Sequence, residues 1–203
     1  MEKILIFFSL LFCLSACGDQ TSSSTPNTQS IDLSGFTVTD LDNGYQHVMK
    51  SDPNGKVLEE GTIKNGKRNG TWVIYNDRRP LPRSVANFVD DVYSGAYMEY
   101  SNTGQLELVC RYKNNQLHGR FIRVKNTRLL EEGNYVNGKI DGNYIKYYPN
   151  KDIAQQEVNY KMDKLHGASK YFNEEGELIM EYEYRDGEKV SGGLIEKKEE
   201  GSE

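Results

Sequence analysis

The hydrophobic and polar positions of the chain follow a pattern that recurs every 23 to 25 residues. In its clearest form, a glycine is followed two positions later by an aromatic side chain: Gly70 and Trp72, Gly95 and Tyr97, Gly119 and Phe121, Gly142 and Tyr144. Gly167 keeps the spacing, with Ser169 in the aromatic position. A second column of large side chains runs in phase: Ile63, Phe88, Tyr112, Tyr135, Tyr160 and Tyr184. Two columns with one period indicate a stacked array in which each unit depends on its neighbours.

The residues that follow each glycine alternate as they do in a β-strand. The positions three and five residues after the glycine are almost all apolar or aromatic: Val73/Tyr75, Met98/Tyr100, Ile122/Val124, Ile145/Tyr147 and Lys170/Phe172. The positions two and four residues after it mix rings with charges. We therefore expect the first set to form the better-buried face of a sheet. The second set should form an aromatic column flanked by solvated charges.

The second half of each unit predicts a partner strand. The residue two positions before each large side chain of the second column is mostly small: Gly61, Ala86, Cys110, Gly133, Val158 and Tyr182. A small residue lets a neighbouring ring lie against the backbone. Turn sequences such as Asn137-Gly138 and Asp186-Gly187 are strong hairpin signals. The predicted fold is all-β: an elongated, twisted antiparallel meander of hairpins about 24 residues long, with about six units and about twelve strands.

The second unit departs from the pattern. The stretch Asn76-Asp77-Arg78-Arg79-Pro80-Leu81-Pro82-Arg83 replaces a short turn. Its two prolines cannot donate ladder hydrogen bonds, so we expect it to bulge or to lie outside the ladder. Its arginines place charge on an irregular loop, which makes the loop a candidate binding element.

The N-terminal residues predict an export signal and a lipid anchor. Residues 4–14 form an apolar run interrupted only by Ser9, with the length of a signal-peptide core and too short to span a bilayer. The sequence Leu14-Ser15-Ala16-Cys17 resembles the lipobox of bacterial lipoproteins. That resemblance implies cleavage before Cys17 and acylation of this residue, and two or more acyl chains such as palmitate anchor a protein firmly. The alternative is an ordinary secretory peptide with an incidental cysteine.

These observations divide the chain into four parts. We expect a signal peptide over residues 1–16, a lipidated N-terminus and flexible linker over 17–35, the repeat domain over 36–193 and a charged tail over 194–203. Glycine rather than aspartate follows Cys17, which favours the outer over the inner membrane.

Composition narrows the classes of function. A net charge of −5 argues against nucleic acid, which binds concentrated basic surfaces. A hydrophobic fraction of 36% with 14 tyrosines favours a thin sheet sealed by amphipathic rings over a thick core. The cysteines Cys13, Cys17 and Cys110 do not predict a disulfide framework. Cys110 lies in the column of small residues, so we expect it to be a buried packing residue and not a reactive thiol.

Two sets of residues are candidates for chemistry. His118 and His166 could be a metal pair, but both directly precede a repeat glycine, where a turn role is expected. Glu59-Glu60 and Glu131-Glu132 could be paired carboxylates of a glycosidase. They occupy one repeat position, which Glu157 and Glu181 continue. This favours a solvated ladder near Arg123 and Lys146, because a catalytic pair needs one special site with two different environments.

The repeat consensus resembles a known family of repeats. It is most literal over residues 131–144, which read Glu-Glu-Gly-Asn-Tyr-Val-Asn-Gly-Lys-Ile-Asp-Gly-Asn-Tyr. This stretch resembles the MORN-variant repeat of the bacterial YwqK-type antitoxins, and the resemblance extends over about residues 44–192. It implies a MORN-like β-sheet and a protein that neutralises a toxin by binding it. It carries over no catalytic, cofactor or metal residues.

We therefore predict a non-enzymatic, lipid-anchored protein of the bacterial envelope that binds another protein through its repeat sheet. An antitoxin or immunity role follows from the resemblance alone. The tyrosine columns could supply contacts, although most of them should pack one repeat on the next. No cofactor, nucleic acid or small-molecule substrate is expected. The alternative is a structural spacer or scaffold that binds cell-wall or surface glycan.

Overall fold

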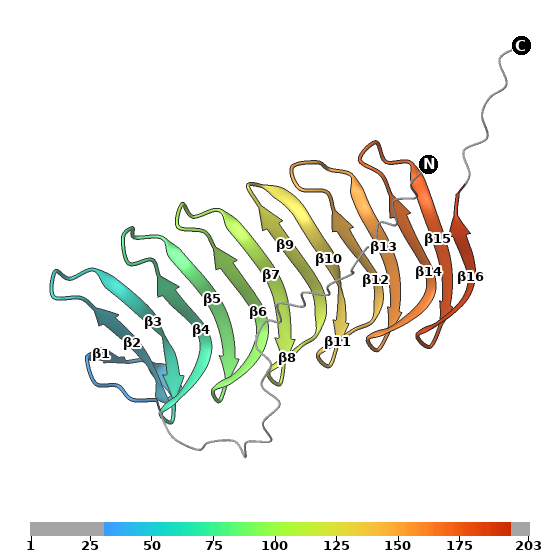
Figure 1. The fold of residues 1–203 in the computed structure, drawn as a ribbon. Helices are drawn as coiled ribbons and strands as arrows, with labels where there is room; N and C mark the ends of the chain where they lie inside the picture. The colour runs from blue at the N-terminus through green and yellow to red at the C-terminus, as the bar shows by residue number, and fades with distance from the viewer. Residues whose placement is uncertain (1–30, 196–203) are drawn as a thin grey trace, which may run out of the picture.

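A computed structural model describes residues 31–195 as a single antiparallel sheet of 16 strands (Figure 1). Strand neighbours follow chain order from β1 to β16, and the short strands β8 and β11 pair with β7 and β10. The strands are β1 (Phe36–Asp40), β2 (Tyr45–Ser51), β3 (Val57–Lys64), β4 (Lys67–Tyr75), β5 (Pro82–Val89), β6 (Val92–Tyr100), β7 (Leu106–Lys113), β8 (Gln116–Leu117), β9 (Gly119–Lys125), β10 (Arg128–Val136), β11 (Lys139–Ile140), β12 (Gly142–Tyr147), β13 (Ala154–Lys161), β14 (Lys164–Phe172), β15 (Leu178–Arg185) and β16 (Glu188–Leu194). The predicted all-β meander is confirmed.

The hairpins stand side by side as curved ribbons along one axis (Figure 1). The six predicted units correspond to the strands from β2 to β15, and β1 and β16 add one strand at each end. A 3-10 turn, η1 (Asp42–Gly44), joins β1 to β2. Within the described residues, no helix is both long and apolar enough to cross a membrane.

Repeat glycines such as Gly95 and Gly167 form a β-bulge, whereas Gly119 and Gly142 begin a new strand after a short break. Opposite the glycine the pairing of the strands shifts, as it does between Val158 and Tyr160 on β13. The glycine has a positive φ that other residues rarely adopt, +91° at Gly167. The bulge turns a carbonyl out of the ladder, and Asn159 Nδ2 donates to that oxygen of Ala168 at 3.0 Å. An equivalent bond joins Asn87 to Ala96 at 3.0 Å, whereas Asn134 donates at 3.3 Å to the carbonyl of Asp141, the residue before its repeat glycine.

The buried face of the sheet is the opposite one to the face predicted. Rings two residues after the repeat glycine are almost inaccessible, with 4% of Trp72, 5% of Phe121 and 7% of Tyr144 exposed. The positions three and five residues after it, such as Val73 and Ile145, are only half-buried. The prediction was wrong because it considered only which of the two faces of a single strand is more hydrophobic. Burial depends on the neighbouring strand, where a small residue lets each ring fold down onto the backbone.

Glycines in the small-residue column give the rings this room. A Cβ added to Gly61 would lie 2.2 Å from Cε3 of Trp72, and one added to Gly133 would lie 2.3 Å from Cδ2 of Tyr144. Ordinary contact begins at about 3.4 Å. The rings therefore occupy the volume that a larger residue would fill, which confirms the proposed reason for the small column.

Two departures from the sequence pattern compensate each other. Ser169 takes the place of a ring, and Tyr182 takes the place of a small residue. The two are cross-strand partners on β14 and β15, and Ser169 is fully buried. At this level of the array, Tyr182 on β15 therefore supplies the ring that β14 lacks.

The described chain begins ahead of the first strand. Ile31 and Leu33, which fall in the expected linker, pack against a core cluster that includes Val48, Ile63 and Trp72. The amide of Ile31 also donates to the Gly66 carbonyl at 3.0 Å. Residues 17–30, the predicted signal peptide over 1–16 and residues 196–203 of the tail lie outside the described residues.

Candidate binding surface

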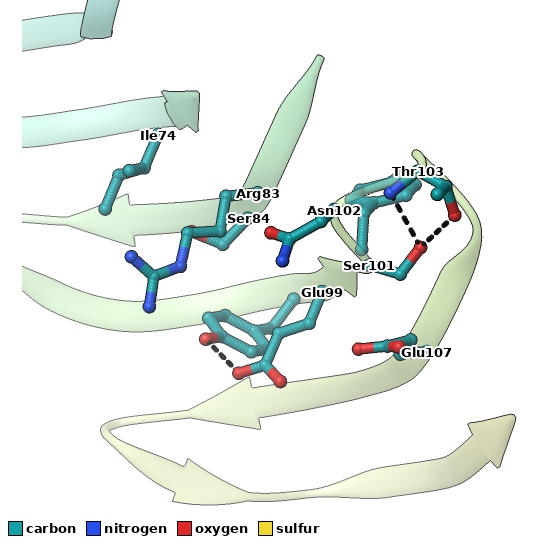
Figure 2. A pocket seen from close by; sticks show the side chains of 10 residues that line it. Ile74, Arg83, Ser84, Glu99, Ser101, Asn102, Thr103 and Glu107 are labelled. Atoms are coloured by element: carbon teal, nitrogen blue, oxygen red, sulfur yellow. Dashed lines mark hydrogen bonds between the residues drawn. The ribbon is translucent and has the colours of Figure 1, made fainter. Parts of the chain in front are cut away.

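A groove of about 820 Å³ opens on the core face of the sheet, over strands β4 to β7 (Figure 2). It lies where the second unit interrupts the repeat. The residues that line it are Ile74, Arg83, Ser84, Tyr97, Glu99, Tyr100, Ser101, Asn102, Thr103 and Glu107. Strands β4 to β7 and the turn between β6 and β7 therefore contribute to this depression.

The irregular loop is fixed by the turn of the next unit. Residues 76–81 lie outside the strands, as predicted, whereas Pro82 and Arg83 already belong to β5. The side chain of Asn76 is buried, donates to Asn102 Oδ1 at 2.7 Å and accepts from the amide of Arg78 at 2.9 Å. These bonds fix the loop against the next turn, and Arg83 follows the loop as the second residue of β5, where the pairing with β4 shifts between Ile74 and Tyr75.

A carboxylate stands in the groove without a cross-strand cation. Glu99 faces Ser84 on one side and Leu108 on the other. Its side chain accepts a hydrogen bond from the Tyr97 hydroxyl at 2.7 Å (Figure 2). Burial, followed by this bond, raises the pKa of Tyr97, so the phenol remains a neutral donor.

Comparable carboxylates elsewhere on this face have a cation beside them. Glu131 pairs with Arg123 at 2.9 Å, and Glu59 lies 3.9 Å from Lys50. In the groove, Arg83 and Glu107 are both exposed, and neither side chain makes a hydrogen bond or ion pair with another described residue. The groove therefore offers both signs of charge to a binding partner.

The direction of each ring depends on the residue beneath it. Where that residue is glycine, the ring crosses it and bonds a glutamate of the preceding strand: the Trp72 indole N–H donates to Glu59 at 3.3 Å, and the Tyr144 hydroxyl donates to Glu131 at 2.8 Å. Beneath Tyr97 the residue is Ala86. Tyr97 turns instead to Glu99 of its own strand, and this difference shapes the wall of the groove.

The predicted carboxylate ladder consists of two equivalent clamps. Glu60 accepts from the Tyr75 hydroxyl and lies 3.2 Å from His47 Nε2. Glu132 accepts from the Tyr147 hydroxyl at 2.8 Å and pairs with Arg120 at 2.9 Å. The bonds from Arg120 and Tyr147 lower the pKa of Glu132. Two matching clamps in a repeat are structural, because a catalytic carboxyl pair requires two different environments.

His118 and His166 occupy equivalent positions directly before a repeat glycine, His118 between β8 and β9 and His166 within β14. His118 Nδ1 accepts from the amide of Asn137 at 3.4 Å, and His166 Nδ1 accepts from the amide of Asp186 at 3.4 Å. Each side chain therefore helps to hold a turn of the next unit, whereas the histidines themselves do not lie in the turns expected for them. Among residues 31–195, no group of three or more His, Cys, Asp or Glu side chains could hold a metal ion. Cys110 is 1% exposed in the small column, as predicted.

Comparison with known proteins identifies the repeat. Residues 140–162 and 165–186 each match the family model of the MORN repeat variant. The chain carries MORN-variant repeats. The two matches cover the hairpins β12–β13 and β14–β15, and the earlier units share their positive-φ glycine. No curated protein matches the chain.

The groove lies on β4 to β7, outside the two hairpins that match the family model. Sequence reasoning found Arg83 through the irregular loop but missed Ile74, Glu99 and Glu107. A signal for them was present. The position two residues before the small column is glutamate in two units, Glu59 and Glu131, but Ser84 and Leu108 here, so the charge pattern already changed at the groove.

Proposed function

We propose that this chain is a lipid-anchored, non-enzymatic protein of the bacterial envelope that holds another protein on its repeat sheet. The groove over β4 to β7 is the proposed contact site. The observation that carries the proposal is the exposed pair Arg83 and Glu107, which line one groove without partners among the described residues.

Three features of the groove support protein binding. It has an apolar wall at Ile74, which is 41% exposed, an aromatic side chain at Tyr97, and both signs of charge. Aromatic contacts surrounded by polar groups are typical of protein interfaces. The repeat sheet also holds one irregular loop in place through the hydrogen bond from Asn76 to Asn102. A toxin-neutralising role is the refinement that the family resemblance supports.

Charge reversal in the groove tests the contact site. The purified protein, bound to a resin, is offered solubilised envelope, and captured proteins are quantified by mass spectrometry. Arg83→Glu and Glu107→Lys should each reduce capture of a specific protein at least about tenfold, a loss of about 1.4 kcal/mol. Arg185→Glu and Glu175→Lys make the same charge changes at exposed positions outside the groove and should leave capture unchanged.

Two outcomes would contradict this proposal. Equal capture by all four variants would remove the groove as the contact site. Retention of the protein on peptidoglycan or surface glycan, with no protein captured, would favour the scaffold role. Rescue of cells that co-express a secreted toxin would support the antitoxin refinement.

The anchor is tested separately. Cells that express the chain are labelled with radioactive palmitate. The wild-type protein should carry the label, and Cys17→Ala should lose both the label and the membrane association. Label that persists in the Cys17→Ala variant would reject the lipid anchor without affecting the groove.

A further inference from the structure

The two ends of the sheet are open edges. Within the described residues, β1 and β16 each have a neighbouring strand on one side only, whereas the strands between them on the path are paired on both sides. Figure 1 shows β1 and β16 at opposite ends of the row of hairpins. Each outer edge therefore presents backbone N–H and C=O groups that no described strand pairs. Such an edge can accept one more strand from another chain.

The number of strands decides how two copies of the chain can join. The path from β1 to β16 contains 14 strands, and each runs antiparallel to the next. Because this number is even, β1 and β16 run in opposite directions. A second copy placed in the same orientation beyond β16 therefore brings its own β1 antiparallel to β16, and its core face lies on the same side. The meander would continue across the junction without a change of pattern.

A line of cross-strand partners through the core face specifies the register of this junction. The line begins at Val38 on β1, which pairs with the buried Val48. It passes through the rings and small residues of the repeats and ends at Gly192 on β16, which pairs with Tyr182. A second copy that continues the line places its Val38 opposite Gly192. The side chain of valine then occupies the core face at a level where β16 has none.

The other side chains of the two edges complement each other in this register. On the core face, Phe36 of the second copy comes opposite Leu194, which is 76% exposed in the single chain. This contact covers the apolar surface of Leu194. On the opposite face, each threonine of β1 meets a small residue of β16: Thr37 meets Gly193, and Thr39 meets Ser191.

Opposite charges meet at one end of the junction. The pairing of β15 with β16 shifts at Val190, so Lys189 lies on the core face with its ammonium 4.1 Å from the ring centroid of Tyr182. In the continued register, Asp40 of the second copy comes beside Lys189. One oxygen of Asp40 accepts from Gln46 at 2.9 Å, and the other makes no hydrogen bond or ion pair with a described residue. That oxygen is free to accept from the lysine.

Pairing of either edge with itself fits less well. Two copies of β16 joined on the same line would set Gly192 against Gly192 and leave the core face without a side chain at that level. Two copies of β1 would set Phe36 against Asp40. We propose that β16 is a docking edge for β1 of a second copy, so that chains join head to tail and continue one sheet. Each join repeats the same step along the axis, so the assembly is an open row and not a closed ring.

Cysteine cross-linking of the purified full-length protein tests this junction. The variant Thr39→Cys/Ser191→Cys places two thiols on opposite residues of adjacent strands, about 4.5–5.5 Å apart between Cα atoms, which a disulfide spans. Within one chain these positions lie 13 strand spacings, or roughly 60 Å, apart, so the bond forms only between copies. Mild oxidation should give a ladder of dimers, trimers and longer species on a non-reducing gel. Wild type controls for the native cysteines and should give no ladder.

Matched variants test the register and the direction. Thr37→Cys/Ser191→Cys moves one thiol two residues along β1, about 7 Å away, and should give at least about fivefold less product. A mixture of the single variants Thr39→Cys and Ser191→Cys should stop at the dimer, because each copy has one reactive edge. Adding Leu194→Asp to the in-register pair should weaken the ladder at least about fivefold, since a carboxylate replaces the apolar contact with Phe36. Leu194 is exposed, so the variant should fold, and circular dichroism verifies this.

Several results would overturn the proposal. A ladder no stronger than that of wild type would remove the junction. Equal ladders from the in-register and out-of-register pairs would indicate random collision. Dimers formed by Ser191→Cys alone, as abundant as those of the mixture, would identify self-pairing of β16. Light scattering of wild type gives an independent measure: the average mass should rise with protein concentration, whereas a constant mass, or a plateau at twice the chain mass, would contradict an open row.

Discussion

Replacing Gly133 with alanine places a methyl group beneath the ring of Tyr144. The added Cβ would lie 2.3 Å from Cδ2 of this ring, whereas ordinary contact begins at 3.4 Å. The ring must therefore move by at least about 1 Å (3.4 − 2.3). It is 7% exposed and its hydroxyl is bonded to Glu131 at 2.8 Å, so the movement costs both packing and a hydrogen bond.

The cost of Gly133→Ala follows from three contributions. Overpacking a buried position costs about 1–3 kcal/mol. The lost hydrogen bond to a carboxylate costs about 1.5 kcal/mol. Alanine reduces the entropy of the unfolded chain relative to glycine and returns about 0.5 kcal/mol, since Gly133 does not have a positive φ. The expected decrease in the free energy of unfolding is about 2–4 kcal/mol.

The assay is urea denaturation followed by circular dichroism, with a double-mutant cycle as control. Tyr144→Ser reproduces the side chain found at Ser169 and removes the ring. In that background, Gly133→Ala should change the free energy of unfolding by less than about 0.5 kcal/mol, because the clash is absent. An equal loss in both backgrounds would refute the conclusion that the small column exists to accommodate rings.

Three further predictions test the bulges and clamps. Asn159→Ala should reduce the free energy of unfolding by about 1 kcal/mol and speed hydrogen exchange around Ala168, because the bulge loses its side-chain donor; unchanged exchange would reject this role. Burial, followed by the bond to Glu132, raises the pKa of Tyr147 to about 12. The neutral phenol of Tyr147 therefore stabilises the fold fully below the unfolded pKa of about 10, and this stabilisation is lost as the pH rises to about 12. Tyr147→Phe should flatten the stability profile in that range, and an unaltered slope would count against the clamp. The pKa of Glu132 is lowered, so its ionised carboxylate stabilises the fold above the ordinary pKa of 4.5, and this stabilisation is lost as the pH falls through the folded pKa. Glu132→Gln should therefore reduce the difference between the urea midpoints at pH 7 and pH 3.

The repeat period and hairpin architecture could be predicted from the sequence. The patterns that predicted it are turn sequences with glycine, alternating side chains and two in-phase columns. They involve residues that lie close together in the chain, and such residues specify the local backbone geometry. The glycine at the bulge shows this directly, because a positive φ of 91° to 111° at these positions is a property of the residue itself. The column of small residues also predicted that Cys110 is a buried packing residue.

Which face is buried was decided only by the tertiary structure. Burial of Trp72 and Tyr144 depends on Gly61 and Gly133, which lie on the neighbouring strand 11 residues earlier. The exchange of ring and small residue between Ser169 and Tyr182 is likewise visible only once the strands are paired. The groove residues Glu99 and Glu107 were missed because nothing in the sequence distinguishes them from other glutamates. They stand out only once the strands are paired, because no neighbouring residue supplies a cation to either carboxylate. Sequence determined the shape of each hairpin, and the register between hairpins determined what each face can bind, because side-chain contacts in a sheet run across strands and not along them.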